Sequence, residues 1–401
     1  MKRRDFIAGV AGVSRSWAEK NPLAGDALFA DVQKYWSLGE HRTGSAADHK
    51  TTEWLNSELK SCGFDTKPPR FEVPVVALGT TRMRIGGQSI PVFPLWPVQG
   101  SLHAEGALGP QGIAVARLPY EAGGALTPTS AGVRLIQQAA EAGASALVLV
   151  TEGPTGEVIA LNHESGVDRW PIPVVLIGPK YADALVAGVH AVLDVEAHVN
   201  QRGYATNAQG LLKGAGGKLI VVSTPKSGWF RCAGERGPGI ALWLGLARSV
   251  ARQKAGPSFL FTANGGHELH GLGMKAFLDR EAPKPANVAC WIHLGAGIAT
   301  YASDGTRLLR TADPKRYLTC TPDLVPVIAP AFRSIPELAP SSERYLGELR
   351  YLAAAGYSGF SVAAGHRLHH TPIDDPSSTG PAILAPVAQA FQSALELVKN
   401  R

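Results

Sequence analysis

Short apolar runs alternate with segments of helical periodicity in the second half of the chain, and this alternation restricts the fold more than any other feature. The pattern predicts strand 218–222, helix 240–251, strands 259–263, 288–294 and 357–363, and helix 381–399. Such an order is typical of an α/β domain with a mixed, mostly parallel sheet sandwiched by helices. Because sites in these domains lie at the carboxyl ends of strands, the loops after residues 222, 263 and 294 are the places to search.

The first half of the chain reads as two helices followed by β structure and then by a separate unit. The helices are predicted at 25–39 and 46–63, and short β runs follow at 71–97. A composition break near 94–97 predicts an inserted small α/β domain at 96–199, and the remaining residues, 19–95 and 200–401, form the main domain. Within the insert we expect strand 112–116, helix 130–142 and strands 144–150 and 172–177.

The amino-acid composition excludes several classes of protein. Of 401 residues, 45% are hydrophobic and 18% charged, which supplies a sizeable core and argues against disorder. The formal charge of +6 is spread along the chain, and a nucleic-acid-binding arm or face is not expected. Four well-separated cysteines exclude a cysteine zinc knuckle, although one or two disulfides remain compatible with their number.

The amino terminus has the order of an export signal. Lys2, Arg3 and Arg4 precede a mild apolar stretch at residues 6–13, and Ser16-Trp17-Ala18 has small residues where cleavage occurs. Paired arginines in this setting resemble a twin-arginine signal over residues 1–18, which predicts a periplasmic or secreted protein. The alternative is a basic tail. No later stretch is expected to span a membrane, so membrane insertion is not predicted.

Several motifs carry a resemblance to a known family. They are the turn Arg42-Thr43-Gly44-Ser45, the pair His267-Glu268 directly after a strand, and the late His369-His370-Thr371-Pro372. In this order they resemble the zinc aminopeptidase family, whose relatives include glutaminyl cyclase and the non-catalytic transferrin receptor ectodomain. The insert resembles a protease-associated domain. The resemblance implies a zinc-exopeptidase-like fold and action on amide bonds of peptides or amino-acid derivatives.

One half of the family's two-metal site is missing. The resemblance places Pro225 where the family has a metal-binding histidine, and Gly295 where it has a metal-binding aspartate. Neither residue offers a side-chain donor. Ser227 replaces the aspartate that orients the first histidine. We therefore expect no second metal ion.

The other half is retained. The resemblance implies that Glu235, Glu268 and His370 bind one zinc ion, and that His267 stands at the position of the general base. One nitrogen and two oxygens with an open position make an acceptable catalytic zinc site. Histidine is a suitable base because its unperturbed pKa lies near neutral pH.

Two other interpretations stay open. In the first, the chain is a non-catalytic binding protein in which Glu235 pairs with Arg236, Glu268 hydrogen-bonds a loop and His370 is a core histidine. In the second, Cys232 is a nucleophile in a metal-free hydrolase. The sequence specifies neither the substrate, which is a small molecule or peptide, nor the oligomeric state.

Overall fold

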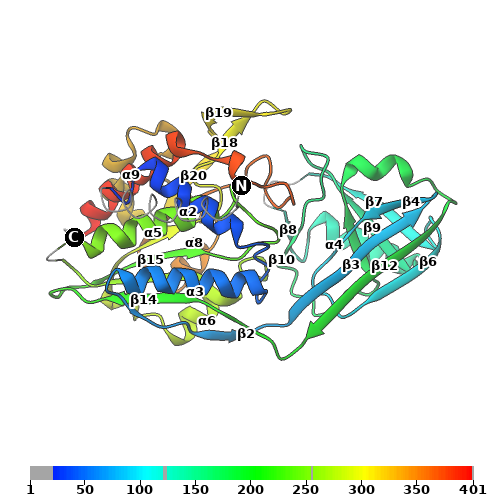
Figure 1. The fold of residues 1–401 in the computed structure, drawn as a ribbon, viewed down its shortest axis with the longest axis horizontal. Coiled ribbons are helices and arrows are strands. Elements are labelled where there is room, and N and C mark those ends of the chain that lie inside the picture. The colour runs from blue at the N-terminus through cyan, green and yellow to red at the C-terminus, as the bar shows by residue number, and fades with distance from the viewer. Residues whose placement is uncertain (1–20, 121–123, 254–255, 400–401) are drawn as a thin grey trace, which may run out of the picture.

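The computed structural model describes residues 21–120, 124–253 and 256–399, so the predicted export signal at residues 1–18 lies outside the described residues. Figure 1 shows two lobes side by side along the longest axis. The larger lobe holds the central sheet between helices, and the smaller lobe consists mainly of strands. The chain enters the smaller lobe along β3 (Val75–Ile85) and returns along β12 (His190–Asn200), so the smaller lobe is an insertion.

The central sheet has seven strands in the order β1-β14-β16-β15-β17-β21-β20. Its four middle strands are parallel, and β1, β14 and β20 pair antiparallel at the two edges. The predicted mixed sheet is therefore confirmed, with its parallel part in the middle. The strands are β1 (Asp65–Thr66), β14 (Ala208–Leu212), β15 (Leu219–Pro225), β16 (Phe259–Asn264), β17 (Val288–Leu294), β20 (Arg316–Cys320) and β21 (Gly359–Ala364).

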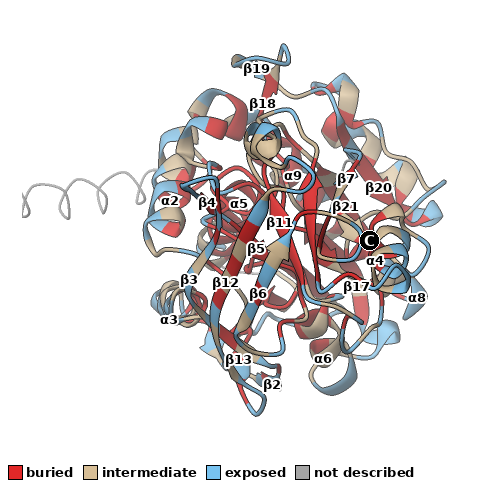
Figure 2. Ribbon diagram, turned by 90° about the vertical axis from the view of Figure 1, so that its right-hand side faces the viewer, coloured by how far each residue is buried: buried red, intermediate tan, exposed pale blue. Residues whose placement is uncertain are grey.

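Helices cover both faces of this sheet, as predicted. Successive residues of a strand point to opposite faces, and β15 shows which helices lie on each. Val222 packs in the cluster that includes residues of α2, α5 and α9, whereas Val221 packs with residues of α6 and α8. Figure 2 shows the buried strands between these layers. The helices are α2 (Gly25–Ser37), α3 (Ala46–Ser61), α5 (Gly237–Ala251), α6 (Leu272–Arg280), α7 (Val325–Ile328), α8 (Leu349–Ala354) and α9 (Pro381–Lys399).

Helix α3 begins and ends as its sequence indicates. The hydroxyl of Ser45 accepts a hydrogen bond from the backbone N–H of Asp48 at 3.1 Å and so caps the first turn of α3. Gly63 follows the end of α3 with a φ of +84°, a conformation that glycine adopts without steric cost.

The insertion contains two four-stranded sheets that share a core. Met83 and Leu193 of one sheet pack with Val148 and Ile177 of the other. The predicted strands around 113–118, 146–151 and 174–177 and the helix before the second of them are confirmed. The elements are β4 (Gln88–Pro91), β3, β12 and β6 (Leu102–Ala107) in one sheet, β5 (Phe93–Pro94), β11 (Val174–Ile177), β9 (Ala146–Thr151) and β7 (Ile113–Leu118) in the other, the pair β8 (Ala125–Leu126) and β10 (Asn162–His163), and helix α4 (Ala131–Glu141).

The boundary predicted at residue 96 falls inside this insertion. Strand β3 pairs along its length with β12, from Val75 opposite Asn200 to Ile85 opposite Ala191. Residues 75–95 therefore belong to the sheet of the smaller lobe. The two lobes are joined near this point by β2 (Arg70–Glu72) and β13 (Tyr204–Thr206), which pair antiparallel. The likeness of the insertion to a protease-associated domain stays a prediction.

Helix α9 differs from the prediction that no later segment reaches membrane-spanning length. Among the described residues, α9 is the one helix long and apolar enough for this, by length and composition alone. Half of its apolar window is buried inside the molecule. Leu384, Phe391 and Leu395 are at most 2% exposed and pack in the main core. The apolar character of α9 is therefore explained by its contact with the sheet and its neighbouring helices.

His41 gives the fold a pH-dependent stability. Its ring stacks on Tyr35 with centroids 3.8 Å apart, and Thr51 Oγ1 lies 3.1 Å from Nδ1. Burial, and next the positive charge of Lys226, lower the pKa of His41 from 6.5 to about 3. Below pH 6.5 the His41 side chain therefore binds a proton in the unfolded chain but not in the folded chain. The contribution of His41 to the free energy of unfolding is full above pH 6.5 and is lost as the pH falls toward 3.

We expect His41→Gln to remove this dependence. Between pH 6.5 and pH 5, His41 should account for about 2 kcal/mol of the loss in unfolding free energy. Urea unfolding at pH 7 and pH 5 measures it, with exposed His198→Gln as the matched control. The explanation is contradicted if His41→Gln loses as much stability between these pH values as the wild-type protein.

Candidate functional site

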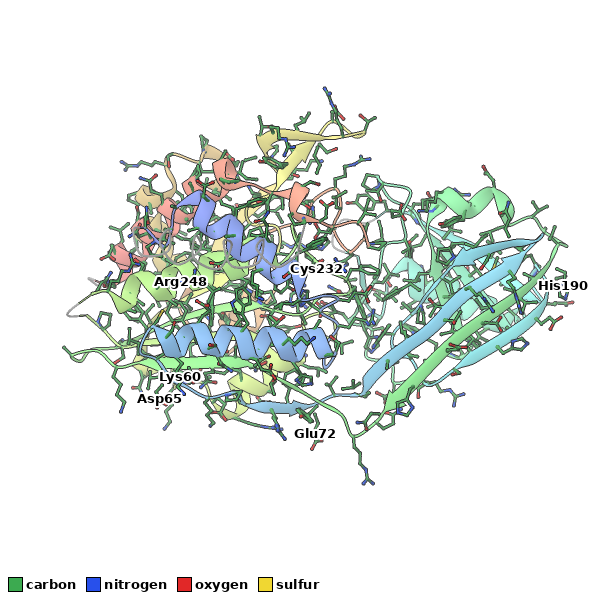
Figure 3. All side chains as sticks on the ribbon, viewed as in Figure 1. Lys60, Asp65, Glu72, His190, Cys232 and Arg248 are labelled. Carbon is green, nitrogen blue, oxygen red and sulfur yellow. The ribbon has the colours of Figure 1, made fainter. Side chains whose placement is uncertain are left out.

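The candidate site lies in the loops that follow β15, β16 and β21, at the carboxyl edge of the central sheet. Glu235 precedes α5, Glu268 lies between β16 and α6, and His370 lies between β21 and α9. All three side chains are almost completely buried. Figure 3 labels Cys232, close to Glu235 in sequence, on the side of the larger lobe that faces the insertion. The loops after β15 and β16, predicted from the strand order, do carry two of the three predicted ligands.

Arg236 bridges the two predicted carboxylate ligands. Its Nη2 lies 2.8 Å from Glu235 Oε1 and donates a hydrogen bond of 2.9 Å to Glu268 Oε1. Its Nε donates to the carbonyl oxygen of Ser227 at 2.7 Å. The Arg236 side chain is fully buried, so its position is fixed on every side by protein atoms. A guanidinium therefore lies where the resemblance placed a metal ion between two carboxylates.

This arrangement fixes the charges of the site. Burial alone would raise the pKa of Glu235, but Arg236 and His370 outweigh it and hold that pKa well below its usual range. Burial opposes the charge of Arg236, yet the two glutamates outweigh it and raise the pKa of Arg236. Glu235 is therefore a carboxylate and Arg236 a cation at neutral pH. The observed ion pair is the one foreseen in the non-catalytic interpretation.

Glu268 has both carboxylate oxygens occupied. Oε1 accepts from Arg236, and Oε2 accepts from the hydroxyl of Ser227 at 2.8 Å. Ser227 Oγ also accepts from the backbone N–H of Gly266 at 2.9 Å, which orients its proton toward Glu268. Glu268 is thus held by hydrogen bonds on two sides before any ligand is considered.

His370 presents one free nitrogen to Glu235. Its Nδ1 lies 3.0 Å from the carbonyl oxygen of Ala160, so Nδ1 carries the proton and Nε2 carries the lone pair in the neutral ring. Nε2 lies 3.3 Å from Glu235 Oε1. A lone pair that faces a carboxylate oxygen at this distance is unfavourable without a positive charge between or beside them.

Several buried acceptor atoms gather beside this pair. Among the described residues, both carboxylate oxygens of Glu235, Nε2 of His370 and Nδ1 of His369 have no hydrogen-bond partner, although Glu235 Oε1 is ion-paired with Arg236 at 2.8 Å. One donor atom from each of these three residues lies within 4.8 Å of the others. Buried polar atoms are normally hydrogen-bonded. Two imidazole nitrogens and a carboxylate fit one divalent cation such as zinc.

Asp374 sets the position of Glu235. Its two carboxylate oxygens each accept a hydrogen bond of 2.9 Å, one from the backbone N–H of Gly234 and one from that of Glu235. Its Oδ1 also accepts from Ser378 Oγ at 2.6 Å. These bonds satisfy backbone donors just before α5, where a negative charge is favourable. The acidic residue that follows the late histidines in sequence is therefore a support for the site.

The positions of the missing metal ligands are closed. Pro225 is the last residue of β15 and has no donor. Gly295 follows β17, and a Cβ atom there would lie 2.6 Å from the carbonyl oxygen of Val362. An aspartate at Gly295 would require the backbone to shift, so this half of the site cannot be restored by a simple substitution.

His267 lies outside the arginine bridge and has its own carboxylate partner. Its Nδ1 lies 3.0 Å from Glu348 Oε1, just before α8. Burial would raise the pKa of Glu348, but His267 outweighs it and holds the pKa below its usual value. The Glu348 carboxylate therefore fixes the ring of His267 and leaves Nε2 as the second nitrogen. No motif marked Glu348 in the sequence, because the contact joins segments far apart in the chain.

Neither alternative nucleophile is exposed. Cys232 is 1% exposed, and burial raises the pKa of its thiol well above the usual value, so the reactive thiolate is disfavoured. Ser223 is completely buried in β15, where its hydroxyl accepts from Trp291 and lies 2.8 Å from Nδ1 of His293. Cys62, Cys232 and Cys320 are free thiols, so no disulfide joins any two of these three.

The insertion covers the site directly. The backbone N–H of Ala160 donates to the carbonyl of His370 at 2.9 Å, and that of His163 donates to the carbonyl of Glu268 at 2.7 Å. Trp229 Nε1 donates to Asn162 Oδ1 at 3.0 Å. A cavity of about 10 Å³ reaches Glu268, which is room for about one water molecule. The centre is closed to an amide substrate in this conformation.

Solved structures with the same fold include zinc aminopeptidases. BSAP, a zinc aminopeptidase from Bacillus subtilis, matches with a TM-score of 0.73 at 18% identity, over 94% of this chain and 95% of that chain. A peptidase M28 precursor from Shewanella amazonensis matches with a TM-score of 0.69 at 18% identity, over 97% and 96%. Glutaminyl cyclase from Porphyromonas gingivalis matches with a TM-score of 0.51 at 10% identity, over 93% and 98%. No family model and no curated protein matches the sequence. The chain therefore has the zinc-exopeptidase-like fold that its motifs predicted.

Proposed function

We propose that this protein is an exported, peptidase-like hydrolase that acts on amide bonds with a single divalent cation, most suitably zinc. The observation that carries the proposal is the group of buried acceptor atoms on Glu235 and His370 that have no hydrogen-bond partner, within the described part of a fold shared with zinc aminopeptidases. Glu235 and His370 are two of the three predicted ligands. Export rests on the amino-terminal sequence alone.

The chain's own residues suit this chemistry. A cation at this place supplies Lewis acidity to a substrate carbonyl when it is bound. His267, oriented by Glu348, is the residue proposed to take the proton from the attacking water. Arg236 holds the two glutamates in place without a second metal. Because residues 160–163 close the centre, we expect the insertion to move before an amide substrate binds.

A non-catalytic binding protein is the second candidate, and one observation favours it. Arg236 already pairs with both carboxylates that were predicted to bind zinc, so each of them has a cationic partner without a metal. In that case the insertion would be a permanent cover. An assay of amide hydrolysis distinguishes the metal-dependent hydrolase from the binding protein.

We expect amino-acid p-nitroanilides or dipeptides to be hydrolysed by the purified protein, and activity to fall to background after chelation. Added zinc should restore it, because the cation provides the Lewis acid. Release of the amine is measured before chelation, after it and after zinc. A panel that is not hydrolysed at all by zinc-loaded protein would favour the binding protein. Hydrolysis that is indifferent to chelators would exclude the metal-dependent mechanism.

A further inference from the structure

We propose that His369, and not Glu268, completes the cation site with Glu235 and His370. This inference rests on the single cation of the proposed function and names the ligands that hold it. It replaces one carboxylate ligand with an imidazole, so the donor set becomes two nitrogens and one oxygen. Such sets are found in catalytic zinc sites with one open position.

Glu268 is unsuited to the role because Arg236 occupies it. The guanidinium hydrogen-bonds Glu268 Oε1, and Ser227 hydrogen-bonds Oε2. A cation bound to Glu268 would have to break one of these bonds and lie against a buried positive charge. Like charges at contact distance repel strongly in a medium of low dielectric constant. Arg236 also lies 2.8 Å from Oε1 of Glu235, but Oε2 of Glu235 has no partner among the described residues, whereas both oxygens of Glu268 are hydrogen-bonded.

His369 has the free atom that Glu268 lacks. Within the described residues its Nδ1 is buried and has no hydrogen-bond partner. Its ring stacks on that of His370, with centroids 4.1 Å apart and an angle of 20° between the planes. Both rings therefore present a nitrogen to the same side, where Glu235 lies.

The backbone explains how two adjacent residues do this. Side chains of neighbouring residues in extended chain point to opposite sides. His370 instead has a φ of +58°, in the left-handed region. That conformation costs about 1 kcal/mol or more for a residue other than glycine, and such strain is often kept at functional sites. Here it turns the two imidazoles toward one carboxylate.

The net charge of Glu235, Glu268 and Arg236 also favours the binding of one cation. Two carboxylates, Glu235 and Glu268, face one guanidinium, so the group carries a net charge of −1 when the histidines are neutral. A buried negative charge without compensation is unfavourable. One divalent cation held by Glu235, His369 and His370 would offset it, while Arg236 continues to compensate Glu268.

The test is the zinc content of four full-length variants after equilibration with zinc and gel filtration. We expect His369→Gln and His370→Gln to weaken zinc binding at least 100-fold, and Glu268→Gln to retain it within a few-fold. Exposed His270→Gln is the matched control and should bind as the wild type does. Retention of zinc by His369→Gln together with loss in Glu268→Gln would overturn the inference.

A second measurement keeps the test decisive if Glu268→Gln does not fold. Copper(II) is bound to the wild-type protein, and pulsed electron paramagnetic resonance counts the coordinated imidazoles. We expect two in the wild type and one in His369→Gln. One imidazole in the wild type, or no bound metal at all, would overturn the inference. Metal on these ligands without amide hydrolysis would leave the inference standing and would refute the proposed function instead.

Discussion

Replacing Arg236 with methionine is expected to lower the free energy of unfolding by about 3–5 kcal/mol. The substitution leaves the carboxylates of Glu235 and Glu268 buried without their shared cation, and an uncompensated buried charge is strongly destabilising. Chemical denaturation at pH 7 in the presence of a chelator measures the loss. Arg307→Met is the control, because Arg307 pairs with Asp304 at the surface and such pairs contribute little.

Added zinc should return part of this stability to Arg236→Met. Without the guanidinium, Glu268 Oε1 loses its partner and becomes available beside Glu235 and His370, so the ligand set predicted from the sequence is restored. Binding to the folded state alone raises its stability with ligand concentration. A loss below about 1 kcal/mol in the variant would contradict the view that Arg236 is the resident cation of the site.

Replacing His267 with glutamine is expected to lower kcat for amide hydrolysis by about 10²–10⁴, the usual contribution of a general base. Glutamine keeps the size of the side chain but cannot take up the proton. Glu348→Gln should lower kcat by at least about tenfold with little change in KM, because Glu348 orients the ring of His267 at 3.0 Å and does not contact substrate itself.

The same assay separates catalysis from structural damage. Exposed His270→Gln should keep the wild-type kcat, and thermal denaturation of each variant reports on its folding. A role limited to structure would change kcat and stability together in Glu348→Gln. Unchanged turnover in folded His267→Gln would show that His267 is not the base.

Much of the fold could be read from the sequence because its signals are local. The apolar run at 218–222 and the helical pattern at 240–251 predicted β15 and α5, and the structure has both, although α5 begins earlier, at Gly237. The boundary of the insertion could not be read in this way. Its position depends on the pairing of β3 with β12, and a pairing between distant segments leaves no local mark.

The sequence predicted which residues lie together better than it predicted their contacts, and the metal-binding roles stay predictions. Glu235 and His370 lie together, as the resemblance implied. Arg236 was visible only as a neighbour of Glu235, and nothing in the sequence indicated that its side chain would turn inward to bridge Glu268. Glu348 was missed entirely, and His369 was interpreted as a loop histidine that could replace a missing ligand. These three roles depend on side-chain direction, which spacing alone does not determine.

The most direct test of the central claim is the metal content of the purified wild-type protein. Elemental analysis after equilibration with zinc and removal of excess should give about one zinc per chain, because the described residues hold one cluster of suitable donor atoms and Arg236 lies where a second cation would be needed. Two ions per chain would contradict the single-cation site. No bound ion would contradict it as well, and would leave Arg236 as the cation between Glu235 and Glu268 in a binding protein with an aminopeptidase fold.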